Sequence, residues 1–249
     1  MTAKRSAVLL VSAVVLGAAL TGCDGVSFHA GREHKAVDDA KVAGQVSAVE
    51  VGTGSGDVRI RPGTGGGVTI HRTVHYDGDT KPTPGQKVEN GRLTFTDGCD
   101  DCSIDYELTV PAGVSVKVST GSGDVDVQGV ASANLKTGSG DLDVAGIPGA
   151  LTTVAGSGDL TATGLGGSDV SATASSGEIQ LTFAKPPQKL AVKASSGDVV
   201  VHVPGGPYAT DVSTGSGDEH VTVPTDPSAT ARIQVKTGSG DVTLSRSGA

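Results

Sequence analysis

The sequence contains very few aromatic side chains, with three Tyr, three Phe and no Trp among its 249 residues. Sites for sugars and for nucleic-acid bases commonly use flat rings for stacking, so the shortage argues against both kinds of site. It also argues against a thick core, since aromatic side chains are the largest apolar groups available to fill one. A thin core of Val, Leu, Ile and Ala is therefore expected.

Helical periodicity is also lacking. Beyond the first 20 residues, no window repeats apolar residues at the 3.6-residue spacing of an amphipathic helix. Gly accounts for 38 residues, and Val and Thr are abundant in short alternating segments. These features predict an all-β chain.

Cysteine is scarce, with only three residues, and the first of them, Cys23, follows an apolar segment at the start of the chain. Lys4 and Arg5 precede an apolar run over residues 7–20, which is shorter than the ~20 residues that span a bilayer and is typical of a signal peptide. The next letters, Leu20-Thr21-Gly22-Cys23, resemble the lipobox of bacterial lipoproteins. The resemblance implies cleavage after residue 22 and a diacylglyceryl group on Cys23; a secretory signal with a coincidental cysteine is the alternative.

The expected location follows from this reading. Residues 1–22 would be a lipoprotein signal peptide, and the polar residues 23–45 a tether to a domain outside the cytoplasmic membrane. Two acyl chains are enough for stable anchoring. Cleavage would remove two cations and no anion, which changes the formal charge from −8 to −10. Nucleic acid is therefore not an expected partner, because phosphate contacts need Lys and Arg.

The other two cysteines lie in Cys99-Asp100-Asp101-Cys102. In an exported protein, a close pair of this kind favours a disulfide that closes a tight turn. Free thiols are one alternative, and a zinc or redox site is another. A single CxxC provides only two of the four ligands that zinc prefers, and the redox motif normally lies in a βαβ unit.

A short motif, typified by Thr-Gly-Ser-Gly-Asp, occurs eight times. From its second copy onward the spacing is 17 to 23 residues, which indicates stacked supersecondary units. We therefore predict a β-solenoid over residues 114–249, preceded by an N-terminal β region over 46–113; an antiparallel meander is the alternative. The acidic residues of the eight motifs are Asp57, Asp124, Asp141, Asp159, Glu178, Asp198, Asp218 and Asp241.

The motif has the composition of a sharp corner. Gly permits positive φ, and Ser and Asp side chains can accept hydrogen bonds from nearby backbone N–H groups at the bend. The residue after the acid is usually Val or Leu, so the acid would be the last outward residue before the chain turns into the core. Glu219 breaks this pattern, and we expect the strand there to begin two residues late, a bulge being the alternative.

The N-terminal β region contains its own strands. Residues 68–76 alternate, with Ile70, Val74 and Tyr76 on one face. Residues 92–96 and 103–110 flank the cysteine turn and are expected to pair with each other in an antiparallel hairpin.

The motif copies, together with residues 106–113 (YELTVPAG), resemble the DUF4097 family of bacterial envelope proteins, the β-strand-repeat adhesin-like proteins. The resemblance covers residues 46–249. It implies an adhesin-like surface protein with no known catalytic residues.

Candidate chemistry is sparse. The corner acids could form a calcium ladder, although the period is about twice that of calcium-binding nonapeptide repeats. His71 and His75 share a strand face but are ~13 Å apart, too far for one metal ion. Carboxylates are expected only at the corners, and no catalytic, metal or cofactor site is predicted.

We therefore expect a non-enzymatic, membrane-anchored scaffold that binds a cell-wall polymer or an envelope protein. The alternatives are a polysaccharide-active solenoid enzyme and a calcium-binding component of an envelope-stress system.

Overall fold

The described part of the chain consists of strands, turns and bends. The computed structural model describes residues 33–99 and 101–247, and no helix occurs among them. Within this range there is accordingly no helix of the length and hydropathy required to cross a membrane. Cys23 and the predicted signal peptide lie outside the described residues.

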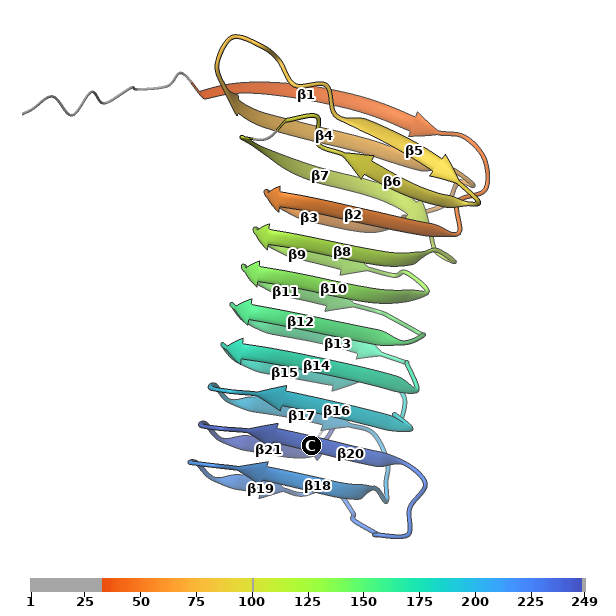
Figure 1. The fold of residues 1–249 in the computed structure, drawn as a ribbon. Helices are drawn as coiled ribbons and strands as arrows, with labels where there is room; N and C mark the ends of the chain where they lie inside the picture. Colours follow the sequence, from red (N-terminus) through yellow and green to blue (C-terminus); the bar gives the residue numbers. More distant parts are fainter. Residues whose placement is uncertain (1–32, 100, 248–249) are drawn as a thin grey trace, which may run out of the picture. The chain divides into compact units, whose positions relative to one another are not determined.

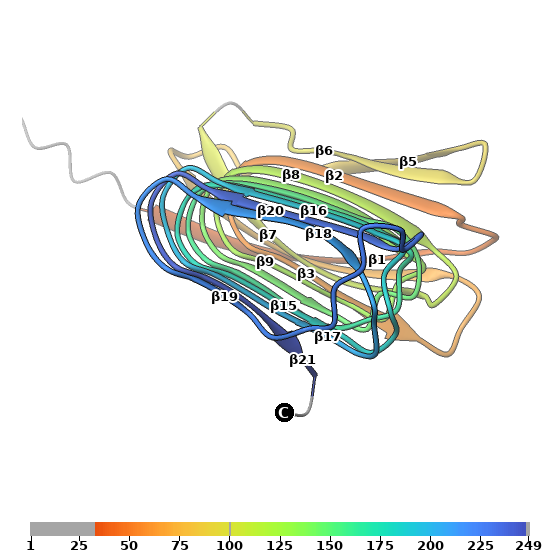
Figure 2. The ribbon, with the colours of Figure 1, turned by 90° about the horizontal axis from the view of Figure 1, so that it is seen from below.

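The strands form two large sheets that face each other (Figure 2). Sheet A contains, in spatial order, β1 (Glu33–Val42), β4 (Val68–Asp77), β7 (Cys102–Pro111), β3 (Val58–Gly63), β9 (Val125–Gln128), β11 (Leu142–Ala145), β13 (Leu160–Leu165), β15 (Ile179–Phe183), β17 (Val199–Val203), β21 (Val242–Arg246) and β19 (Glu219–Val221). Sheet B contains β18 (Ala209–Thr214), β20 (Arg232–Thr237), β16 (Lys189–Ala194), β14 (Asp169–Ser176), β12 (Leu151–Ser157), β10 (Ser132–Ser139), β8 (Ser115–Ser122), β2 (Ala48–Ser55), β6 (Arg92–Thr96) and β5 (Gly85–Glu89).

Each repeat forms one rung, which is a strand of sheet B, a corner and a strand of sheet A (Figure 1). In the second copy, β8 ends at Ser122, Gly123 and Asp124 form the corner, and β9 begins at Val125. Neighbouring rungs pair in parallel, with β8 beside β10 and β9 beside β11. The predicted β-solenoid is therefore correct, and an antiparallel meander is excluded for these rungs.

The core is a thin layer of aliphatic side chains between the two sheets. In the Asp141 rung, Leu135, Leu142 and Ile147 have no exposed surface. A single rung of this kind buries too little apolar area to fold alone, so stability is expected to come from contacts between neighbouring rungs. The predicted inward positions after the corner acids are all buried: Val58, Val125, Leu142, Leu160, Val199 and Val242.

The last two rungs do not stack in sequence order. The Asp241 rung, β20 and β21, lies between the Asp198 rung and the Asp218 rung, which is the outermost one (Figure 1). Here the expectation for Glu219 was wrong: β19 begins at Glu219, in register with the buried Val242. Glu219 faces the open end of the core, and its Oε1 accepts a hydrogen bond from the Thr214 N–H at 3.1 Å. A polar residue fits there because a terminal rung needs a water-compatible outer side.

At the other end, the sheets finish in antiparallel strands. The predicted tether over residues 23–45 is wrong for residues 33–42, which form β1 and pair with β4. Its alternation is weak in the sequence because its inward positions include Ala36, Asp38 and Ala40, which are small or charged.

The expected hairpin across the cysteine turn is also wrong. β6 pairs with β5 and β2 in sheet B, whereas β7 pairs with β4 and β3 in sheet A. The turn therefore connects the two sheets. Both strands alternate, and alternation alone does not identify a strand's neighbour.

Candidate functional site

The second glycine of the corner motif is present in all eight copies, and the geometry explains why. Gly140 has φ of +136°, and a Cβ atom there would lie 2.2 Å from the carbonyl oxygen of Gly123 in the neighbouring rung. No side chain fits this close approach. The first glycine is less restricted, since Ser175 and Ser195 replace it in two copies.

The corner acids form a ladder of hydrogen bonds between rungs. Asp124 Oδ1 accepts a bond from the Asp141 N–H at 2.9 Å, and Asp141 Oδ1 accepts one from the Asp159 N–H at 2.8 Å. Six of the eight acids, all except Glu178 and Asp218, thus accept a bond from the corner of the next rung, whereas the sequence suggested bonds only within each acid's own bend. The ladder occurs in two stretches, one from Asp57 through Asp124, Asp141 and Asp159 to Glu178, and the other from Asp198 through Asp241 to Asp218. Between the two, the Ile179 N–H donates a backbone bond to the Asp198 carbonyl oxygen.

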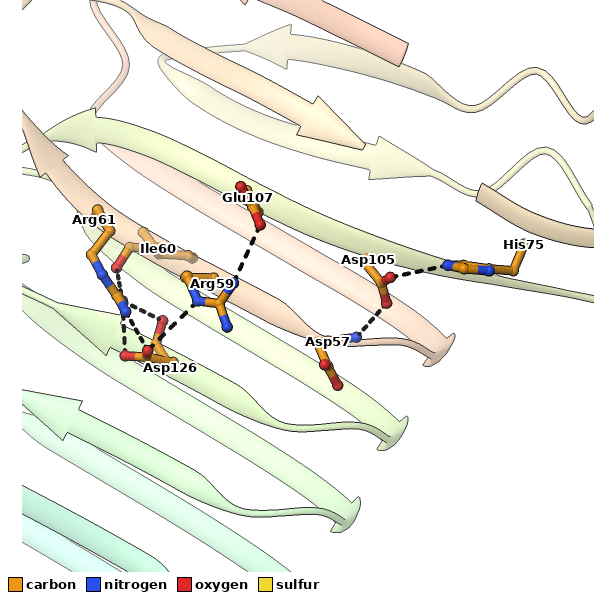
Figure 3. Close-up of polar contacts among 8 residues, drawn as sticks. All are labelled: Asp57, Arg59, Ile60, Arg61, His75, Asp105, Glu107 and Asp126. Carbon is orange, nitrogen blue, oxygen red and sulfur yellow. Dashed lines mark hydrogen bonds and ion pairs between the residues drawn. The ribbon is translucent and has the colours of Figure 1, made fainter. Parts of the chain in front are cut away.

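The ladder continues into the N-terminal cap, which consists of β1, β4 and β7 of sheet A and β5 and β6 of sheet B. Asp105 Oδ1 accepts a bond from the Asp57 N–H at 3.0 Å, and its other oxygen lies 3.2 Å from His75 Nε2 (Figure 3). Asp105 occupies the place that a corner acid holds in the other rungs, although it belongs to strand β7 and to no motif copy. His75 is therefore a hydrogen-bond partner of Asp105 at the end of the ladder.

The outer face of sheet A carries a row of charged side chains. Arg59 lies 3.2 Å from Glu107 and 3.8 Å from Asp126, and Arg61 pairs with Asp126 through both of its terminal nitrogens (Figure 3). These strands are neighbours, so the side chains form a cross-strand network. His71 extends the row to β1 through a 2.6 Å contact with Asp39.

The sequence suggested that carboxylates lie only at the corners. This expectation was wrong, because carboxylates also lie on the outer face of sheet A. Asp126 and Asp143 are in register on neighbouring strands and line a shallow cavity of about 290 Å³ with Gln128, Thr161 and Thr163. Burial, followed by the charges of Asp126 and the nearby corner acids, raises the pKa of Asp143. Asp126, by contrast, forms ion pairs with Arg59 and Arg61.

The outer face of sheet B is different in character. Its outward residues are mainly Ser, Thr, Gly and Ala, with lysine and arginine at intervals. Near β2, Lys117 and Arg92 pair with Glu50 at 2.6 Å and 3.1 Å, and their hydrogen bonds lower the pKa of that carboxyl. At the other end, Lys236 Nζ lies 3.0 Å from Asp211.

The N-terminal cap contains a buried cation that the sequence analysis did not identify. Arg72 is 2% exposed and points into the core, where its Nη2 donates to Asp38 at 2.5 Å and to Gln86 at 2.8 Å. These partners belong to β1 of sheet A and β5 of sheet B, so Arg72 joins the two sheets. Its position between Ile70 and Val74 would have predicted an inward side chain.

The predicted cysteine pair lies beside this cap. Cys99 and Cys102 form a disulfide, with their Cα atoms 5.9 Å apart. Among the described residues, no group of three or more His, Cys, Asp or Glu side chains has the arrangement of a metal site.

The chain was compared with known proteins. The family model of Toastrack DUF4097 matches residues 43–245, and no curated protein matches. A candidate adhesin from Bacteroides fragilis is 15% identical, with coverage of 86% of this chain and 97% of that one and a TM-score of 0.48. A candidate lipid-binding protein from Parabacteroides distasonis is 14% identical, with coverage of 87% and 98% and a TM-score of 0.43. Since the family model covers most of the sequence, the chain belongs to the Toastrack DUF4097 family.

Proposed function

We propose that this protein is a non-enzymatic, adhesin-like scaffold, anchored by lipid to the extracytoplasmic face of the cell membrane, that presents its flat sheet faces to an envelope component. The observation that carries the proposal is the regular stack of in-register rungs. Hydrogen bonds at every corner hold the rungs at a fixed spacing, so each outer face is a rigid array of side chains. Such an array suits a repetitive or extended partner.

The anchor is proposed from the sequence Leu20-Thr21-Gly22-Cys23. Cells expressing Cys23→Ser should incorporate no labelled palmitate into the protein and should release it from the membrane fraction. A variant with Cys99→Ser and Cys102→Ser is the matched control and should keep the label. Label retained on Cys23→Ser would refute the anchor.

The partner is an envelope polymer or an envelope protein. Crosslinking in intact cells, followed by purification of the protein, should recover one of these two classes reproducibly. Recovery of the protein alone, at a crosslinker density that captures known neighbours in the same membranes, would count against a scaffold that binds.

One observation favours a second function, a polysaccharide-active enzyme. Asp126 and Asp143 place two carboxyl groups with different environments on one sheet face, as acid and base pairs often are. Turnover of an envelope polysaccharide by the parent protein, lost in both Asp126→Asn and Asp143→Asn, would support this function. Absence of turnover across a panel of such glycans is the result that the scaffold proposal predicts.

A further inference from the structure

Positive charge is concentrated on the outer face of sheet B. On the seven strands from β8 to β18, the outward side chains include six cations and two carboxylates. The whole chain, in contrast, has a formal charge of −8. We call this surface the basic face; its cations are Lys117, Lys136, Lys189, Lys193, Arg232 and Lys236, and its carboxylates are Asp169 and Asp211.

Four of these cations are arranged as two like-charged pairs. Lys189 is in register with Arg232, and Lys193 with Lys236, on the neighbouring strands β16 and β20. Neighbouring strands are ~4.8 Å apart, so both pairs repel, and such cross-strand pairs destabilise a sheet. Within the described part of the chain, only Lys236 of the four forms an ion pair, with Asp211. Lys189 also has Asp169 in register on its other side, on β14, so the cluster holds four cations and two carboxylates. A bound anion would relieve the remaining repulsion between the two like-charged pairs.

The surfaces around the basic face would confine an anion to it. Five residues beyond Lys193 and Lys236, the chain reaches the corner acids Asp198 and Asp241. This acidic edge runs along the stack and repels negative groups. On the outer face of sheet A, by contrast, Arg59 and Arg61 are already paired with carboxylates.

The uncharged side chains of the basic face indicate what kind of partner it binds. Between the cations lie short hydrogen-bonding side chains, among them Asn134, Thr152, Ser171 and Gln234. Val154 is the one large apolar side chain that is exposed on these seven strands. Surfaces that enter a membrane interface normally carry Trp, Phe or Leu, so a lipid bilayer is the poorer match. A chain of anionic groups lying flat across the strands is the better one.

We propose that the basic face binds a linear envelope polymer that carries anionic groups, phosphate or carboxylate, along its backbone. The cluster on β16 and β20 forms the strongest contact. Beside it, Arg232, Gln234 and Asp211 line a cavity of about 420 Å³. Asp211 is paired there with Lys236 and Gln234, so an anionic group would bind on the Arg232 side of the cavity. This inference rests on the proposed scaffold function and names its partner class.

The test compares the full chain with two charge-matched variants, and all three proteins, the parent included, carry Cys23→Ser so that no acyl chain enters a membrane. The face variant is Lys193→Gln with Lys236→Gln. The control is Lys41→Gln with Lys81→Gln, which removes the same charge from exposed positions outside the basic face. The probes are long-chain polyphosphate and polygalacturonate, with phosphatidylglycerol vesicles as the third arm.

The parent should bind at least one polymer, with an affinity that falls as salt concentration rises. The face variant should bind about tenfold more weakly at low salt, with a shallower salt dependence, while the control binds as the parent does. The face variant should unfold at the parent temperature or above, because a like-charged pair has been removed.

Three results would overturn the proposal: equal binding by parent and face variant, equal loss in face variant and control, or binding to the vesicles and to neither polymer. Polyphosphate and polygalacturonate distinguish a phosphate from a carboxylate polymer. If these assays fail while crosslinking still recovers an envelope protein, the scaffold function stands and only the polymer assignment is wrong.

Discussion

The tight corner provides the most direct quantitative prediction, through Gly140→Ala. Two penalties add at this position. An Ala at φ of +136° is in a region that L-residues avoid, and its Cβ would begin 2.2 Å from the Gly123 oxygen. To reach 3.0 Å, the two rungs must separate by about 0.8 Å, which weakens the hydrogen bonds on both sides of the corner. We expect a loss of roughly 2–4 kcal/mol in the free energy of unfolding.

Gly52→Ala is the matched control. Gly52 lies in a strand of the same stack, and a Cβ atom added there would have no other atom within 4 Å. Its change should stay within about 0.5 kcal/mol of the parent.

The assay is thermal and urea unfolding followed by circular dichroism. For a domain of this size, the expected loss in Gly140→Ala corresponds to a decrease of roughly 5–15 °C in the unfolding temperature. Equal stability of Gly140→Ala and Gly52→Ala would refute the close approach of the corners and, with it, the stated reason for the second glycine.

Three further predictions concern the ends of the stack and its outer face. Asp38→Asn should destabilise the protein by about 2–4 kcal/mol in urea unfolding, since it leaves the buried Arg72 without its counter-ion; Asp39→Asn, on the exposed side of the same strand, should change stability by less than about 0.5 kcal/mol. Glu219→Val should make the end rung apolar and increase self-association in analytical ultracentrifugation, whereas Glu219→Gln should sediment as the parent does; equal sedimentation of Glu219→Val and the parent would contradict the capping role. The raised pKa of Asp143 means that its ionised form opposes folding, so its effect is favourable at acid pH and is lost as pH rises through the folded-state pKa. Asp143→Asn should therefore raise the unfolding temperature at pH 7 and give no gain at a pH below the unfolded pKa of about 4, where Asp143 is protonated in both states; a gain that is independent of pH would show that the charge is not the cause.

The repeat was predictable because its cause is local. Positive φ at one glycine, an outward acid and an inward aliphatic residue define the corner within five letters, and the same letters recur at each rung. The inward positions followed from alternation and were confirmed.

The sequence was less informative wherever pairing between distant strands decides the outcome. β1 was missed because Ala36, Asp38 and Ala40 give little hydrophobic contrast at the end of a sheet. The Asp241 rung lies between the Asp198 rung and the Asp218 rung, and no local sequence feature predicts this order, since both rungs have the same motif. Only the polar Glu219 indicates which rung is terminal.

The charged pairs on the outer faces could be identified only from the register between neighbouring strands. Asp126 and Asp143 are 17 residues apart in sequence, and Lys193 and Lys236 are 43 apart, yet each pair is side by side on neighbouring strands. The inward position of Arg72, by contrast, could have been predicted from alternation, because Arg72 lies on the same strand face as Ile70 and Val74.

The acceptor role of the corner carboxylate is tested most directly by comparing Asp141→Asn with Asp141→Ala, with and without calcium, in urea unfolding. An Asn side chain keeps an oxygen that can accept the bond from the Asp159 N–H and removes a negative charge from the ladder. Asp141→Asn should therefore be at least as stable as the parent, Asp141→Ala should lose about 1 kcal/mol, and calcium should affect all three proteins equally. If both variants lose the same stability, and only the parent gains stability from calcium, the carboxylates bind metal and do not serve to join the rungs.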